Sequence, residues 1–367
     1  MTVRYGIIGA GMMGQEHMRN IFLLDGAEVS AFADPDPDMR TAAHNLSGAE
    51  GFADYREMLA SGLCDALVIV TPNHTHINVM RDCLKTDLPI LCEKPLGINV
   101  AECQEIAALT NARSAPVWVA MEYRYMPPVQ RLLEEVEKGT TGPLQMLAIR
   151  EHRFPFLPKV NDWNRFNENT GGTLVEKCCH FFDLMRLILG GEPVRVYASG
   201  AMDVNHRDES YHGRQPDILD NAFVVVDFDN GTRAMLDLCM FAEGSYWQEV
   251  ITATGPDARV EAKIPGPARF NPSGEERLSQ MVISPRVSKR VETHDIHVDH
   301  LVLSAGDHHG STYYQHRKFL DIIRNGGEPE VSVADGLIAV AVGAAAEESV
   351  RSGQAVTLPR LALRGAA

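Results

Sequence analysis

The chain opens with Arg4-Tyr5-Gly6-Ile7-Ile8-Gly9-Ala10-Gly11-Met12-Met13-Gly14, in which a short apolar run leads directly into a G-x-G-x-x-G motif. The run predicts a buried strand, and the pattern after it predicts a helix over Met12–Leu23. Between a strand and a helix, three such glycines permit a tight turn, close approach of the backbone to a pyrophosphate, and close helix–strand packing. The motif therefore predicts a dinucleotide site. Its candidate cofactor-binding residues are Gly9, Gly11, Met12, Met13 and Gly14.

Asp34 lies 20 residues after Gly14, at the end of the next predicted strand. A carboxylate at this position can accept hydrogen bonds from both ribose hydroxyls of an adenosine and would repel a 2′-phosphate. The alternative is a glycine-rich turn beside an unrelated strand-end aspartate. The two signals together favour NAD as the cofactor over NADP.

The first third of the chain alternates apolar runs with helical patterns. Strands are expected at Arg4–Ile8, Glu28–Phe32, Ala66–Val70, Pro89–Cys92 and Val117–Met121, and helices at Met12–Leu23, Tyr55–Ala60, Thr75–Lys85 and Val100–Asn111. Strands separated by helices of this length form β-α-β units and a parallel sheet. Right-handed crossovers bring the loops after the strands to one sheet edge, where ligands bind. Residues 1–122 are therefore predicted to form an α/β, NAD-binding Rossmann domain.

The pattern changes after Met121. The expected strands pair around hairpin turns at 229–231 and 255–257, and the expected helices are Pro127–Lys138, Leu174–Leu189, Tyr313–Arg324 and Ala334–Arg351. This pattern predicts an α+β domain over residues 123–367 with a mostly antiparallel open sheet, for substrate binding and oligomerisation. Its C-terminal helices are free to pack back on the first domain. Two long irregular loops, 152–172 and 265–280, are candidates for function.

Composition restricts the class of protein. With 367 residues and 45% apolar content, the chain can form two cores without disulfides, and its seven cysteines show no paired spacing typical of zinc sites. Its longest apolar stretch is far below the roughly 20 residues of a membrane span. A formal charge of −15 disfavours nucleic acid and anionic membranes as partners. We expect a cytoplasmic protein with reduced thiols and no metal.

The stretch Thr71-Pro72-Asn73-His74-Thr75-His76 follows a buried strand at the same sheet edge as the glycine loop. Thr71, Pro72, Asn73 and His76 are candidates to line the dinucleotide. For each histidine alone, helix capping or surface polarity is the favoured alternative, and Asn73 or Thr75 suits the N-cap of the next helix.

Glu93-Lys94-Pro95 ends another predicted strand. A lysine at the carboxyl edge of a parallel sheet faces the ligand crevice, where burial or a neighbouring cation can lower its pKa toward catalytic use. A surface lysine beside a turn proline is the alternative. Glu93 and Lys94 are both candidate cofactor contacts, and Lys94 is also a candidate catalytic and substrate residue.

In the second domain, Gly171-Gly172 leads into a predicted helix on which Glu176 and His180 lie four residues apart, on one face. A carboxylate and an imidazole placed in this way suit proton transfer. Thr173-x-x-Glu176 is also a capping box, which would use Glu176 structurally. A metal site at the adjacent cysteines before His180 is disfavoured, because neighbouring side chains on a helix point apart.

Further candidate substrate residues are Trp163, Arg165, Arg153 and Arg124. Arginine can bind a phosphate or a polyol, and a tryptophan face can pack on a sugar ring. Anchoring of the surrounding loop is an equally supported role for each.

In combination, the motif Gly9–Gly14, the Thr-Pro-Asn-His turn, Glu-Lys-Pro, and W-x-R before a Gly-Gly helix with a histidine resemble the Gfo/Idh/MocA oxidoreductase family. That family includes glucose–fructose oxidoreductase and inositol dehydrogenases. The resemblance implies a Rossmann domain followed by an α+β domain whose sheet mediates dimer or tetramer formation. It also implies that Lys94 contacts the reacting hydroxyl, that His180 transfers the proton, and that Arg165 lies near cofactor or substrate.

One position departs from the family pattern, which usually has an aspartate four residues before the histidine. This chain has Glu176 there, and two cysteines precede His180. Glutamate keeps the charge but reaches one methylene further, so the orientation of the histidine can differ.

These features predict an NAD-dependent dehydrogenase that transfers hydride between a secondary hydroxyl of a sugar, polyol or sugar derivative and the nicotinamide. One alternative is a redox-neutral glycosidase that retains NAD and acts by transient oxidation and elimination. A second is a non-enzymatic nucleotide-binding regulator. The expected partners are a small-molecule substrate and further copies of the chain, in a homodimer or homotetramer.

Overall fold

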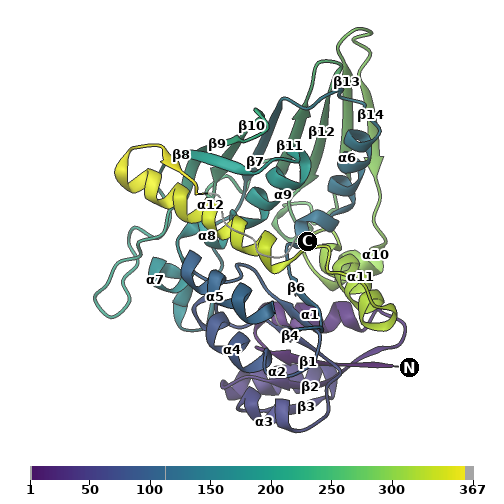
Figure 1. Ribbon diagram of the computed structural model, residues 1–367, viewed down its shortest axis with the longest axis vertical. Coiled ribbons are helices and arrows are strands. Elements are labelled where there is room, and N and C mark those ends of the chain that lie inside the picture. Colours follow the sequence, from purple (N-terminus) through teal and green to yellow (C-terminus); the bar gives the residue numbers. More distant parts are fainter. Residues whose placement is uncertain (1, 112, 360–367) are drawn as a thin grey trace. The chain divides into compact units, whose positions relative to one another are not determined.

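The computed structural model describes residues 2–111 and 113–359 (Figure 1). The chain divides into two compact units, which we call the first unit (residues 2–122 and 299–340) and the second unit (residues 123–298 and 341–359). The last helix, α12 (Val333–Ser352), begins in the first unit and ends in the second. Within the described ranges, no helix has both the length and the apolar content that crossing a membrane requires.

The first unit contains a six-stranded parallel sheet in the order β3-β2-β1-β4-β5-β6. Its strands are β1 (Val3–Ile8), β2 (Ala27–Ala33), β3 (Glu50–Phe52), β4 (Ala66–Ile69), β5 (Ile90–Cys92) and β6 (Val117–Val119). This is the strand order of a dinucleotide-binding fold, and the prediction of a Rossmann domain is confirmed. The strands β4, β5 and β6 are buried along their whole length, which explains why they read as continuous apolar runs.

The helices of the first unit are α1 (Met12–Ile21), α2 (Pro37–Ser47), α3 (Tyr55–Ala60), α4 (His76–Cys83), α5 (Val100–Thr110), α10 (His300–Ala305) and α11 (Ser311–Asn325). The helix α1 contacts α10 and α11, and α4 contacts α5. Neither α2 nor β3 was predicted from the sequence. Only Ala43 of α2 is buried, and β3 has three residues without a buried one, so neither element carries a periodic apolar pattern.

The second unit contains a nine-stranded sheet in the order β14-β13-β12-β11-β7-β10-β9-β8-β15. Its strands are β7 (Met146–His152), β8 (Pro193–Ala201), β9 (Asn221–Phe228), β10 (Arg233–Cys239), β11 (Trp247–Thr254), β12 (Ala258–Pro265), β13 (Ser279–Pro285), β14 (Glu292–Ile296) and β15 (Val356–Thr357). Every neighbouring pair is antiparallel except β7 and β10. The mostly antiparallel sheet of the predicted α+β domain is confirmed. The helix α6 (Pro127–Glu137) packs on β11, β12 and β13.

The single helix expected over Leu174–Leu189 is wrong. The chain forms two helices there, α8 (Thr173–Glu176) and α9 (Cys179–Leu189), preceded by α7 (Asn167–Thr170). Cys178 is the N-cap residue of α9, and its carbonyl accepts hydrogen bonds from the amides of both Phe181 and Phe182. Glu176 and His180 therefore belong to consecutive short helices rather than to one face of a single helix.

Candidate functional site

The glycine loop of the first unit has the geometry that its motif predicts. Gly9 has φ of 98°, and a Cβ atom there would lie 2.5 Å from the carbonyl oxygen of Val70. A Cβ on Gly14 would lie 2.0 Å from the carbonyl oxygen of Gly9, so α1 packs against the loop at a distance that only glycine permits. Around Gly11, by contrast, a Cβ would meet no described atom within 4 Å, which leaves the outer side of the loop open.

The N-terminus of α1 fits a bound pyrophosphate. Its N-cap residue is Gly11, and no side chain among the described residues caps the helix. The first amides of a helix have no partner within it, and the helix dipole favours an anion there. Met12, Met13 and Gly14 therefore present backbone N–H groups of the kind that hold the phosphates of a dinucleotide.

Asp34 connects the end of β2 to the glycine loop. Its Oδ2 accepts a hydrogen bond of 2.8 Å from the amide of Ala10, and its Oδ1 accepts one of 2.9 Å from the amide of Asp36. The residue is half-buried. These two bonds hold the carboxylate beside the glycine loop.

The turn after β4 lies against the same loop, because the amide of Thr71 would be 3.0 Å from a Cβ on Gly9. The imidazole of His76 is fully buried, and its nitrogens lie 2.8 Å from the carbonyl oxygen of Pro95 and 2.9 Å from that of Thr71. Burial lowers the pKa of His76, although both carbonyl contacts oppose this. His76 therefore joins the Thr71 turn to the Lys94–Pro95 turn, which supports a structural role for this predicted cofactor residue.

Glu93 and Lys94 follow β5 at the carboxyl edge of the sheet, where Lys94 is half-buried. The carboxylate of Glu93 accepts a hydrogen bond of 3.0 Å from the amide of Lys94 and lies 2.9 Å from Nε2 of His17 on α1. Nδ1 of His17 lies 2.7 Å from Nε2 of His316 on α11. Neither histidine was predicted as a site residue from the sequence. His17 lies three residues after Gly14, about one helical turn along α1, and this spacing places both on the buried face of the helix.

Burial and neighbouring charges shift the pKa values of these three groups in different directions. Burial disfavours a charge on His17, but the hydrogen bond to Glu93 and the surrounding carboxylates raise the pKa of His17. Burial also opposes ionisation of Glu93, yet the contact with His17 lowers the pKa of Glu93. Burial and the charge of His17 bring the pKa of His316 well below its usual value. The contact with Glu93 therefore stabilises the charged form of His17, and the hydrogen bond from the Lys94 amide to Glu93 connects this pair to the backbone that carries Lys94.

In the second unit, the predicted capping box is absent. Thr173 is the first residue of α8 rather than its N-cap, and its hydroxyl donates to the carbonyl of Leu219. The amide of Leu174 is instead bound by the carboxylate of Glu347 from α12, at 2.8 Å. Gly172, the N-cap residue of α8, has φ of 97°, a conformation that residues with a Cβ rarely adopt, so glycine is favoured there. The structural alternative for Glu176, as the partner of Thr173 in a capping box, is therefore wrong.

His180 is buried near the start of α9 and stacks on the ring of Tyr123. The two ring centroids are 4.1 Å apart, and the ring planes differ by 5°. The hydroxyl of Tyr123 accepts a hydrogen bond of 2.7 Å from Nζ of Lys177, which also lies 2.9 Å from the carboxylate of Glu151 on β7. Tyr123, Lys177 and Glu151 were not predicted as site residues, because their association depends on three separate segments of the chain.

Arg165 ends the segment η3 (Val160–Arg165), which also carries the half-buried Trp163. Its buried guanidinium forms an ion pair of 2.9 Å with Glu209 in the connection between β8 and β9. His206 and Tyr211 also bind this carboxylate. Burial alone would raise the pKa of Glu209, but the hydrogen bonds from these residues and Arg165 lower it. The contacts support the loop-anchoring role for Arg165.

The other two predicted arginines also bind carboxylates. Arg124 forms a bidentate ion pair with Asp183 of α9, through contacts of 2.6 and 2.5 Å, and both side chains are buried. Arg153 lies with one guanidinium nitrogen 3.6 Å from Glu151 and with its guanidinium carbon 4.2 Å from the centre of the Phe154 ring. Arg124 thus ties the start of the second unit to the helix that carries His180.

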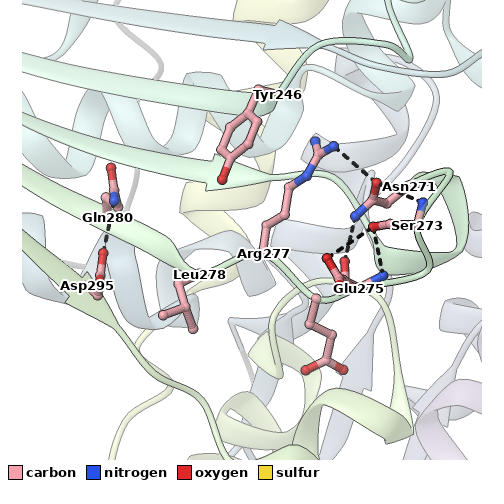
Figure 2. Close-up of a pocket in the computed structure, with 9 residues that line it drawn as sticks. Tyr246, Asn271, Ser273, Glu275, Arg277, Leu278, Gln280 and Asp295 are labelled. Atoms are coloured by element: carbon pink, nitrogen blue, oxygen red, sulfur yellow. Dashed lines mark hydrogen bonds between the residues drawn. The ribbon is translucent and has the colours of Figure 1, made fainter.

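A polar cavity of about 470 Å³ lies elsewhere in the second unit (Figure 2). Its walls come from Tyr246, from the loop before β13, and from Gln280 and Asp295 on neighbouring strands. Figure 2 shows Arg277 directed toward Asn271, to which it donates a hydrogen bond of 3.1 Å. The lining contains no lysine or histidine and none of the predicted site residues.

Comparisons with known proteins match both units. The model of the NAD-binding Rossmann fold of an oxidoreductase family matches residues 3–121, and the model of the C-terminal alpha/beta domain of the same family matches residues 134–358. The chain is 27% identical to myo-inositol 2-dehydrogenase of Thermotoga maritima, over 97% of this chain and 98% of that protein. It is 26% identical to inositol 2-dehydrogenase of Rhizobium meliloti, over 98% of this chain and 100% of that protein.

Solved structures show the same fold. A probable dehydrogenase from Thermotoga maritima superposes with a TM-score of 0.78 at 24% identity, covering 97% of this chain and 98% of that one. Levoglucosan dehydrogenase in complex with NADH and levoglucosan superposes with a TM-score of 0.82 at 20% identity, covering 98% of this chain and 100% of that one.

Proposed function

Because the chain belongs to the Gfo/Idh/MocA oxidoreductase family, we propose that it is an NAD-dependent dehydrogenase of a sugar, polyol or sugar derivative. The observation that carries the proposal is the association of an uncapped α1 N-terminus, a glycine loop open at Gly11 and the carboxylate of Asp34. These features suit the pyrophosphate and the ribose of a dinucleotide. Similarity to inositol dehydrogenases over nearly the whole chain supports a polyhydroxylated substrate.

We propose that the cofactor is NAD rather than NADP. The Asp34 carboxylate already binds the amides of Ala10 and Asp36, so it is held beside the loop. An ionised carboxylate accepts ribose hydroxyls and repels a 2′-phosphate. The guanidinium of Arg40 is directed to the backbone carbonyls of Asp34 and Pro35, which supports the turn rather than a phosphate site.

In the proposed mechanism, Lys94 binds and polarises the oxygen of the reacting secondary alcohol. His180 accepts the proton of that hydroxyl, and Glu176 stabilises the charged imidazole. The bound nicotinamide supplies the acceptor for the hydride that leaves the carbinol carbon. Glu93 and His17 hold the backbone of Lys94 in place from the interior of the first unit.

The decisive experiment follows the absorbance of NADH while purified protein is given NAD and a panel of polyols, free sugars, and alkyl and aryl glycosides. Sustained production of NADH from one stereochemical group of polyols or sugars would support the dehydrogenase. Release of an aglycone without net NADH would contradict it and favour the redox-neutral glycosidase, which uses the same residues. Tight binding of NADH without turnover of any compound would favour the regulator.

We also propose that the protein forms a homo-oligomer through the open face of the second unit's sheet. Exposed apolar side chains align across neighbouring strands, because Tyr197 on β8 pairs with Val225 on β9, which pairs with Met235 on β10. Phe223, two residues before Val225 on the same strand, is 60% exposed. A contiguous apolar row on an uncovered sheet is typical of a protein–protein interface.

A further inference from the structure

The chain of contacts that ends at His180 lies entirely within the second unit and is buried throughout. Glu151 is 0% exposed, Tyr123 1%, His180 2% and Lys177 4%. A charged lysine at this depth requires a partner, and Glu151 provides one at 2.9 Å. Glu151 lies on β7, which is paired on both sides by β10 and β11 in the middle of the sheet. One end of the contact chain is therefore fixed to a central strand of the sheet.

The other end is the stacked pair of Tyr123 and His180. Nζ of Lys177 lies 2.7 Å from the Tyr123 hydroxyl and 4.8 Å from the centre of its ring. The lysine thus donates a hydrogen bond to the phenol oxygen. The phenol ring in turn stacks on the face of the imidazole, with the two ring planes 5° apart. Rotation of the His180 ring would break this stack.

We propose that Glu151, Lys177 and Tyr123 are positioning residues that fix the plane of the His180 imidazole and set its protonation. This inference rests on the proposed function only for the role of His180 as the proton acceptor. Lys177 carries a positive charge at the hydroxyl of the phenol that stacks on the imidazole, and Glu151 balances this charge. The two charges therefore have opposite effects on the protonation of His180, and removal of either charge leaves the effect of the other unbalanced.

Two single variants test the electrostatic part. In Lys177→Met the carboxylate of Glu151 remains, so the midpoint of the His180 titration, followed by NMR of the ring protons and assigned with His180→Gln, should rise. In Glu151→Gln the buried ammonium loses its ion partner, and in the fraction of molecules that keep Lys177 charged the midpoint should fall. The other ionisable groups near this chain, Arg124, Arg153, Glu176, Cys178, Asp183 and Glu347, are the same in both variants, so opposite shifts identify the Lys177–Glu151 pair as their cause.

The double variant Lys177→Met/Glu151→Gln separates position from charge. Replacing a buried ion pair by neutral residues of similar volume often preserves stability, so this variant remains informative if a single variant fails to fold. The His180 midpoint should return to the wild-type value. The kcat should be roughly 10- to 100-fold below the wild-type value, because the Tyr123 hydroxyl has lost the hydrogen bond from Lys177. Tyr123→Phe keeps the stacked ring but loses the same hydrogen bond, and should lower kcat while NAD affinity is unchanged.

Lys138→Met serves as the matched control, because Lys138 is exposed and pairs with carboxylates on α6. It should change neither kcat nor the His180 midpoint. The proposal is overturned if both single variants leave the midpoint unchanged or move it in the same direction, or if Tyr123→Phe has the wild-type kcat. If the wild-type protein turns over no compound, the proposed function fails, and the NMR titration alone decides the inference.

Discussion

At the scale of single residues, Lys94 carries the sharpest functional expectation. It is half-buried at the carboxyl edge of the sheet, directly after Glu93. The variant Lys94→Ala should lower kcat by roughly 100-fold or more, because the reacting oxygen loses its polarising cation. The dissociation constant of NADH, measured by fluorescence, should stay close to the wild-type value. An equal loss of cofactor affinity would contradict the assigned role.

Asp34 provides the second expectation at this scale. Asp34→Asn keeps one oxygen for the amide of Ala10 but removes the charge and one acceptor. Affinity for NAD should fall by about 10-fold, the equivalent of about 1.4 kcal/mol, because ribose hydroxyls bind a carboxylate more strongly than an amide. The preference for NAD over NADP should fall as well. Comparison of the two dissociation constants by calorimetry checks this, and an unchanged preference would remove Asp34 from the specificity site.

At the scale of elements, the contact between α12 and α8 makes stability depend on pH. Burial raises the pKa of Glu347 to about 7, against the opposing hydrogen bond from the amide of Leu174. An acid with a raised pKa in the folded state favours folding while it is protonated. The stability it contributes is therefore present below the unfolded pKa and is lost as the pH rises toward about 7.

Glu347→Gln should remove this dependence, because the amide oxygen can still accept the hydrogen bond from Leu174 without carrying a charge. The variant should gain roughly 2 to 3 kcal/mol of unfolding free energy over the wild type at pH 8 and almost nothing at pH 4. Urea denaturation at both pH values measures the difference. Equal effects at the two pH values would show that Glu347 does not titrate in this range.

The elements also show where prediction from sequence fails. The strands of the first unit are buried on both faces and bounded by turns, so their apolar runs are visible along the chain. The break between α8 and α9 has no such local signal, because no glycine or proline lies between Glu176 and His180. Contacts from distant segments accompany this break: the side chain of Lys177 extends to Tyr123 and Glu151.

At the scale of the whole molecule, the open sheet face is the feature with a testable consequence. Phe223→Glu places a charge in the apolar row and should weaken self-association by roughly 100-fold, since buried apolar anchors dominate interface energy. Light scattering after size-exclusion chromatography measures the mass of the species. Glu328→Lys, an exposed change on the first unit, should leave the mass unchanged. A wild-type protein that is monomeric at every concentration would refute the proposed interface.

The features that could be predicted from the sequence depend on residues that are close to one another along the chain. The strand, the glycine turn and the helix of Gly9–Gly14 are consecutive, and Asp34 ends the next strand, so backbone geometry and apolar pattern were enough to predict the Rossmann domain. The polar contacts of Lys177, Arg165 and Leu174 in the second unit were decided only by the tertiary structure. Lys177 lies 54 residues from Tyr123, Arg165 lies 44 residues from Glu209, and Leu174 lies 173 residues from Glu347. Each of these pairs joins polar groups that are shielded from water only when distant segments pack together, and no pattern of neighbouring residues records that packing.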